Sequence, residues 1–118
     1  MQIRYTNSKV KNVCTSLKEA KKKCSGTIPE KLHAAINFIE NASNITDIIN
    51  YPPFHFHHLK GSRMGEYAID IGGRTSGWRL IMIPIDNDGN ACSNDEVYGK
   101  NAINIVIVQL EEVTNHYE

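Results

Sequence analysis

Residues 66–85, EYAIDIGGRTSGWRLIMIPI, contain two strand-like segments joined by a glycine-rich connector. Apolar and polar side chains alternate over Glu66–Ile71, and a period of two is typical of a strand. Gly72–Gly77 has the glycine and serine content of a turn. A second strand is expected over Trp78–Ile85, and Pro84 predicts that it ends or loses its pairing there. This stretch therefore predicts the β part of the fold.

Helical segments are expected in the first half of the chain. Apolar residues recur at helical spacing over Ser8–Cys24, after a short strand expected over Ile3–Tyr5. A second helix is expected to begin within Thr27–Glu30, which fits a capping box. Residues 44–50 predict one further helical turn. Tyr51–Pro53 then stops helix formation and favours extended backbone.

The second half continues with a long polar loop over Asp86–Lys100 and an apolar run over Ile103–Leu110. Because nearly every position of that run is apolar, it predicts a central strand covered on both faces. The order of elements predicts one α+β domain over residues 1–118, with two N-terminal helices packed on a small, mostly antiparallel sheet.

Composition excludes several classes of protein. With 41% hydrophobic and 22% charged residues, the chain has the composition of a folded globular domain. No apolar run reaches the roughly 18 residues that a membrane-spanning helix needs, and the first residues lack the apolar core of a secretion signal. Cys14, Cys24 and Cys92 are odd in number and form no CxxC motif, which favours reduced thiols and a cytoplasmic protein.

The net charge of zero hides an asymmetry along the chain. Thirteen Lys and Arg balance thirteen Asp and Glu, which taken alone argues against a strongly basic nucleic-acid binder. Residues 1–65, however, hold ten basic and four acidic residues, whereas residues 66–118 hold three and nine. The basic half could dock a phosphate backbone, with weaker non-specific affinity than a uniformly basic protein would have.

Two clusters of polar residues suggest metal sites, and both are disfavoured. An extended segment would send His55 and His57 to one side and His58 to the other, and no cysteine pair or HExxH motif accompanies them. His55 is interpreted as an ordinary exposed strand or loop residue. Residues 86–90, DNDGN, begin like a calcium loop but lack its later glycine and glutamate, which favours a polar turn. No metal or other cofactor is expected.

Three short motifs carry a resemblance to a known family. They are FHHLKG at residues 56–61, the pair Trp78-Arg79 at the start of a predicted strand, and EVTNHY at residues 112–117. In this order and at about this spacing they resemble the RelE/ParE superfamily of toxins from type II toxin–antitoxin systems. The resemblance is greatest to the HigB-like, or plasmid maintenance killer, group, whose members typically carry L-H-P-L-K-G, a W-R pair and a terminal E-x-Y-H. It covers roughly residues 30–118.

The chain departs from that family pattern in three places. His58 stands where the family has proline, and the loop over residues 86–100 is longer than the tight turn of short members. The terminal pair reads His116-Tyr117, the reverse of the family's order. Because neighbouring side chains of a strand point to opposite faces, this reversal leaves open which of the two enters the site.

The resemblance implies a ribosome-dependent mRNA endonuclease that inhibits translation, uses the RNA 2′-hydroxyl as nucleophile and needs no metal. It implies that His57 is a general acid or base or a phosphate ligand, that Lys60 binds phosphate, and that Arg79 stabilises the transition state. His116 or Tyr117 would transfer a second proton or stack on a base. The residue types suit these roles, because histidine exchanges protons near neutral pH and arginine presents a permanently charged planar fork to phosphate.

Other cations could add affinity for the RNA backbone. They are Arg63, Arg74, Lys21, Lys22 and Lys23. Simpler interpretations stay open beside these roles. The lysine run is also what a solvated helix end looks like. Arg79 could pair with Glu66 or Asp70 across the sheet.

The resemblance also implies partners. They are the ribosome, mRNA and a cognate antitoxin, expected to be a small helix-turn-helix protein encoded next to this chain; no membrane is implied. The alternative is a protein of the same fold that acts by binding alone, either a gyrase-directed toxin or an inactive binding module. Such a protein would not need the combination of His57, Lys60 and Arg79.

Overall fold

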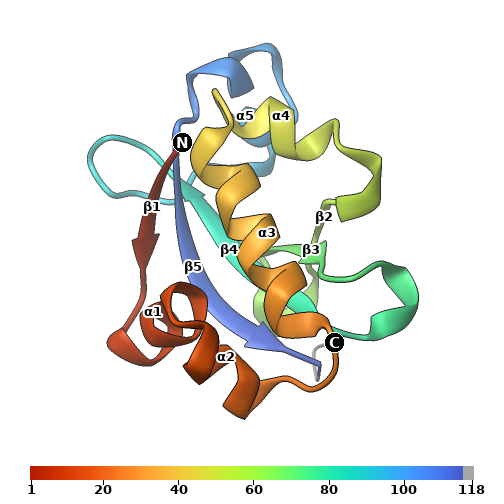
Figure 1. Ribbon diagram of the computed structural model, residues 1–118. Helices are drawn as coiled ribbons and strands as arrows, with labels where there is room; N and C mark the ends of the chain where they lie inside the picture. The colour runs from red at the N-terminus through yellow and green to blue at the C-terminus, as the bar shows by residue number, and fades with distance from the viewer. Residues whose placement is uncertain (116–118) are drawn as a thin grey trace.

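The computed structural model describes residues 1–115. These residues form a five-stranded sheet in the order β1-β5-β4-β3-β2 (Figure 1). β1 runs parallel to β5, and the other neighbouring pairs are antiparallel. The strands are β1 (Gln2–Tyr5), β2 (His57–His58), β3 (Tyr67–Asp70), β4 (Arg79–Ile85) and β5 (Ile107–Thr114). The predicted α+β class with a mostly antiparallel sheet is therefore confirmed.

Helices α1, α2 and α3 lie across one face of this sheet (Figure 1). Within residues 1–115 the α-helices are α1 (Ser8–Thr15), α2 (Leu17–Lys23), α3 (Ile28–Asn41), α4 (Ile45–Ile49) and α5 (Asn94–Val97). Short 3₁₀ segments are η1 (Pro52–Phe54), η2 (Gly61–Arg63), η3 (Arg74–Ser76) and η4 (Lys100–Asn104). Leu32, Ile36 and Ile39 of α3 form the buried stripe that packs against the sheet.

The first predicted helix is in fact two helices. The prediction of one continuous helix is wrong, because the backbone of Ser16 is extended, with φ of −123° and ψ of 117°. Its hydroxyl accepts a hydrogen bond from the backbone N–H of Glu19 and so caps α2. Its own N–H donates to the carbonyl of Asn12 and closes α1. A serine side chain can replace a helical hydrogen bond in this way. The spacing of apolar residues does not predict such a break.

The caps and breaks around α3 and α4 agree with prediction only in part. Thr27 has φ of −92° and ψ of 0°, and its side chain makes no capping hydrogen bond, so the predicted capping box is wrong. The predicted further turn is α4, capped by Asn44, whose side chain accepts from the N–H of Thr46 at 2.9 Å. Tyr51 is extended as predicted, but residues 52–54 form η1 instead of extended backbone.

The polar segment over residues 86–100, predicted as a loop, is largely structured. Gly89 has a φ of 86° in the tight turn that follows β4. α5 comes next, and Ser93 and Glu96 form a reciprocal capping box at its start. The segment therefore contains a turn and a short helix.

Two strand boundaries also differ from the prediction. β5 starts at Ile107 and not at Ile103, because residues 100–104 form η4. Pro84 does not end β4, since it pairs with Val108 and the strand continues for one more residue. The Pro84 carbonyl accepts from Cys92, which lies outside β5. The nitrogen and the carbonyl of one strand residue point to the same side of the strand. The Pro84 carbonyl points away from β5, and so does its nitrogen, so the N–H that proline lacks would not have bonded to β5.

Both faces of the sheet carry buried residues. The main core lies between the helices and the face that carries Tyr67 and Leu80, both fully buried. The opposite face, called the second face below, carries a smaller cluster of Leu59, Ala68 and Ile81. In the described part of the chain, no helix is both long enough and apolar enough to cross a membrane.

Candidate functional site

The register of the sheet brings candidate residues together on the second face. His57 of β2 pairs with Ala68 of β3, and Asp70 of β3 pairs with Arg79 of β4. Ala68 and Asp70 are two positions apart on one strand, so their side chains lie on the same face. Paired residues on neighbouring strands also share a face. His57 and Arg79 therefore lie on the same face as Asp70.

Arg79 is held by the buried carboxylate of Asp70 and by the loop before β4. Its Nε lies 2.9 Å from Oδ1 of Asp70, and its terminal nitrogens donate to the carbonyls of Trp78 at 2.8 Å and Arg74 at 3.0 Å. The Asp70 side chain is 0% exposed and that of Arg79 is 12% exposed. The pairing of Arg79 with Asp70, left open by the sequence, is present. Each guanidinium nitrogen thus has a protein oxygen beside it.

The three neighbouring histidines divide between two sides, as predicted. The rings of His55 and His57 are 4.8 Å apart, and Nδ1 of His57 donates to the carbonyl of His55 at 2.8 Å. His58 instead lies beside Tyr98, with Nδ1 3.4 Å from the hydroxyl. Across residues 1–115, no three His, Cys, Asp or Glu side chains come together as metal ligands.

His55 contacts the buried carboxylate that also holds Arg79. Its backbone is left-handed, with φ of 46° and ψ of 50°, where an extended segment was predicted. The ring is 44% exposed, and its Nδ1 lies 3.7 Å from Oδ2 of Asp70. Sequence reasoning missed this contact. The available signal was Asp70 itself, an acidic residue between two isoleucines in a predicted strand.

Arg63 joins the η2 segment to β5. Its guanidinium donates to Glu66 at 2.9 Å and to Glu112 on β5. The hydrogen bond with Glu112 is the largest cause that raises the pKa of Arg63 above its ordinary value. Two carboxylates therefore compensate its charge, which lowers the attraction that it can contribute to an RNA backbone.

Lys60 and Arg74 are exposed cations on segments that contact the second face. Lys60 directly follows Leu59, which is buried on that face, and Arg74 lies in η3, where its carbonyl accepts from Arg79. Neither side chain forms a salt bridge within residues 1–115. Both are therefore available to a phosphate.

The lysine run ends α2 and is exposed to solvent. Lys22 pairs with Glu19 at 3.1 Å. Lys23 lines a groove of about 270 Å³ whose lining also includes Glu111 and Glu112 of β5. Glu112 is also a partner of Arg63, but Arg63 is not among the residues that line this groove.

Part of the polar segment 86–100 supports the candidate site from the helix side. Tyr98, directly after α5, lies edge-on to Phe56 with ring centroids 6.2 Å apart. Phe56 in turn stacks on Tyr67 at 5.2 Å. These contacts brace the chain directly before His57. The start of the segment is the predicted polar turn, since Asp86 Oδ1 accepts from the N–H groups of Asp88 and Asn90.

The terminal pair His116 and Tyr117 lies outside the described residues, so the roles implied for it stay predictions. The strand before it ends at Thr114, which is buried and pairs with Arg79. β5 therefore brings the chain to the neighbourhood of Arg79 directly before these two residues.

No protein-family model matches the chain, and a search of curated proteins finds no significant match.

Proposed function

We propose that this protein is the toxin of a type II toxin–antitoxin system, a cytoplasmic and ribosome-dependent mRNA endonuclease that inhibits translation without a metal cofactor. The observation that carries the proposal is the shared face of His57 and Arg79, which lie far apart in sequence and meet through the register of β2, β3 and β4. The motif order resembles that of the HigB-like group, and the α+β fold agrees with that resemblance.

The chemistry proposed for the site is attack of the RNA 2′-hydroxyl on the adjacent phosphate. The O2′–P bond forms and the P–O5′ bond breaks, which leaves a 2′,3′-cyclic phosphate and a 5′-hydroxyl. A carbonyl oxygen can only accept, so Nδ1 of His57 must carry the hydrogen that it donates to His55. In the neutral ring Nε2 then has the lone pair, and this nitrogen is the one that would take the proton of the 2′-hydroxyl.

Lys60 and Arg79 are proposed to stabilise the negative charge of the pentavalent phosphate. Lys60 is exposed and can turn toward a ligand. Arg79 is fixed by Asp70 and by two carbonyls, so it contributes a positioned positive charge. His116 or Tyr117 remains a proposed second group, and Arg63, Arg74 and Lys21–Lys23 are proposed contacts to the RNA backbone.

One observation favours the alternative of a protein that acts by binding alone. Each guanidinium nitrogen of Arg79 already has a protein oxygen beside it, and Arg63 is compensated by two glutamates. A gyrase-directed toxin or an inactive binding module could use both arginines purely to hold the fold together. The proposed endonuclease needs Lys60, whereas this alternative does not.

Induced expression in growing bacteria tests the proposal. The wild type should arrest growth and produce message fragments with 5′-hydroxyl and 2′,3′-cyclic phosphate ends, cut inside codons that are being translated. Lys60→Ala should lower cleavage by about 10²-fold, which is the usual effect of removing one group that stabilises developing charge. Lys100→Ala, another exposed lysine, is the matched control and should cleave like the wild type. Growth arrest with intact messages would contradict the endonuclease and support the alternative.

Co-expression tests the proposed antitoxin. A small helix-turn-helix protein encoded beside this chain should restore growth and co-purify with it. Failure of every neighbouring reading frame to restore growth would contradict the toxin–antitoxin part of the proposal.

A further inference from the structure

We propose that His55, oriented by the buried carboxylate of Asp70, is a second proton-exchanging histidine of the site and protonates the leaving 5′-oxygen, while His57 takes the proton of the attacking 2′-hydroxyl. This inference rests on the proposed endonuclease function. It replaces His116 or Tyr117 in the role of the group that protonates the leaving oxygen.

The backbone of His55 is held in an unusual conformation. Within residues 1–115 it is the one non-glycine residue with a positive φ. The left-handed region is unfavourable for a residue that has a side chain, so it persists where the surroundings fix it. Here His55 ends η1, and its N–H donates to the carbonyl of Pro52 at 3.0 Å. The rigid turn with two prolines therefore determines where the ring is placed.

The His55 ring lies close to the buried carboxylate of Asp70. That carboxylate is 0% exposed, and within residues 1–115 neither oxygen has a partner with hydrogen-bond geometry. Burying such a group without hydrogen bonds is costly. The nearest nitrogens are Nε of Arg79, 2.9 Å from one oxygen, and Nδ1 of His55, 3.7 Å from the other. Catalytic hydrogen bonds are often long in the absence of substrate and shorten when it binds.

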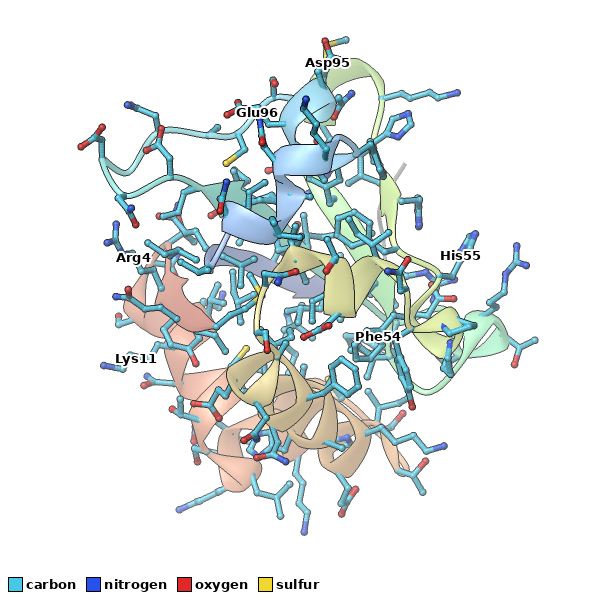
Figure 2. The ribbon with its side chains drawn as sticks, turned by 90° about the horizontal axis from the view of Figure 1, so that it is seen from above. Arg4, Lys11, Phe54, His55, Asp95 and Glu96 are labelled. Carbon is cyan, nitrogen blue, oxygen red and sulfur yellow. The ribbon has the colours of Figure 1, made fainter. Side chains whose placement is uncertain are left out.

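The geometry also separates the two nitrogens of the His55 ring. Nδ1 is the ring nitrogen that lies near Asp70, 3.7 Å from Oδ2, so Nε2 is the nitrogen left for a substrate. The ring is 44% exposed although its partner carboxylate is buried. Figure 2 shows His55 at the margin of the molecule beside Phe54, well separated from the acidic residues Asp95 and Glu96 of α5. A phosphate arriving from solvent could therefore reach it.

The two histidines are placed as a pair. Their rings are 4.8 Å apart and tilted by 34°, and the hydrogen bond from His57 to the carbonyl of His55 links their positions. The charged and titratable groups that the structure places around His55 are Asp70 from β3, Arg79 beyond it on β4, and His57 from β2. η1 contributes none, because it consists of two prolines and a phenylalanine.

The proton balance of the step is complete without another reactant. Nε2 of His57 takes one proton from the 2′-hydroxyl as the O2′–P bond forms, and Nε2 of His55 gives one proton to the 5′-oxygen as the P–O5′ bond breaks. His57 ends protonated and His55 ends neutral. Exchange with water restores both rings.

Single-turnover cleavage of a message on purified programmed ribosomes, measured from pH 5.5 to 9, tests this assignment. The wild-type rate should follow a bell-shaped profile, because one histidine must be neutral and the other protonated. His55→Asn tolerates a left-handed backbone but cannot exchange protons, so it should lower the rate by about 10²-fold and abolish the alkaline limb. His58→Asn, a histidine on the other side of the same segment, should keep both the rate and the profile.

Two further variants separate proton transfer from a structural effect. His55→Gly suits the left-handed φ and should regain part of its rate when imidazole is added, because imidazole can supply the missing proton donor. Asp70→Asn should lower the rate less than His55→Asn and keep the alkaline limb, since the histidine remains.

The outcomes distinguish the two levels of the proposal. An alkaline limb that persists in His55→Asn but disappears in His116→Asn would overturn this inference and leave the endonuclease standing. Absence of imidazole rescue in a folded His55→Gly protein would also count against it. No cleavage by the wild type on ribosomes would overturn the proposed function and this inference together.

Discussion

Arg79→Gln should destabilise the fold strongly, because it leaves the carboxylate of Asp70 buried without its closest cation. The Asp70 side chain is 0% exposed and Arg79 is 12% exposed, so solvent screens this pair little. Removing one partner of a buried ion pair typically costs about 3–5 kcal/mol, most of it from the charge left behind. His55 lies 3.7 Å from the carboxylate and offsets only a part of this loss.

The loss in unfolding free energy converts to a change in melting temperature. The entropy of unfolding is about 2.1 cal/mol/K per residue, or about 0.25 kcal/mol/K for this chain. A loss of about 3–5 kcal/mol then lowers the melting temperature by about 12–20 °C. Thermal unfolding followed by circular dichroism, with urea denaturation for the free energy itself, measures both quantities.

A double-mutant cycle separates the charge effect from the loss of packing. Asp70→Asn keeps the shape of the side chain and removes the charge. It should cost about 1–2 kcal/mol, less than Arg79→Gln, because Arg79 keeps its two carbonyl acceptors and is 12% exposed. Adding Asp70→Asn to Arg79→Gln should recover stability, with a coupling energy of at least about 1.5 kcal/mol. A melting temperature of Arg79→Gln within about 4 °C of the wild type, which corresponds to about 1 kcal/mol, would refute the reasoning.

The same cycle decides how a loss of activity should be interpreted. If Arg79→Gln unfolds in the cell, its failure to cleave messages says nothing about catalysis. The double variant restores the fold without restoring the guanidinium. Loss of cleavage in that folded double variant, beyond the loss seen in Asp70→Asn alone, would support the role proposed for Arg79 at the phosphate.

Three other measurements test the structure independently. Burial raises the pKa of Cys14 and of Tyr67 to about 12 each, so the unfolded chain loses these protons first. Unfolding free energy should therefore fall as pH rises from about 8.5 toward 12, by up to about 1.4 kcal/mol per pH unit and group, and urea titrations that show no fall by pH 10.5 would contradict this. Gly72→Ala should cost only slightly more than Gly26→Ala, by up to about 1 kcal/mol. Both residues have positive φ, and at Gly72 the new Cβ would lie 2.9 Å from the terminal methyl of Ile28, which can move aside. Glu112→Gln removes an exposed carboxylate that pairs with Arg63, so it should strengthen binding of naked RNA by up to about fivefold at low salt. Filter binding at a series of salt concentrations measures this. An unchanged binding curve would show that Arg63 does not contact RNA.

The class of fold could be predicted from the sequence because its signals are local. The alternation of residues 66–71 and the apolar run before Leu110 mark strands whatever their partners are. Breaks that depend on a single polar side chain could not be predicted so well. Ser16 divides a helix whose apolar spacing is continuous, and Thr27 leaves unused a capping box that its sequence allows.

The candidate site could be predicted only as a set of residues, and its connections could not. Burial of Asp70 depends on how β2 and η1 close over the end of β3, and no local pattern encodes that. The left-handed turn at His55 depends on the preceding prolines and on its neighbours in space. The sequence allowed the pairing of Arg79 with Asp70 to be suggested, because both residues stand in predicted strands. The contact between Asp70 and His55 could not be suggested, because it depends on how β2, β3 and β4 pair in the sheet.

The parallel pairing of β1 with β5 governs when the chain can fold. Gln2 pairs with Ile107, about a hundred residues later, and β5 also pairs with the whole of β4. During synthesis, the centre of the sheet therefore cannot assemble until β5 has emerged from the exit tunnel, and such long-range pairing is slow. Because Arg79 itself pairs with Thr114 of β5, the face of the sheet that carries Arg79 cannot form in a nascent chain from which β5 is still missing.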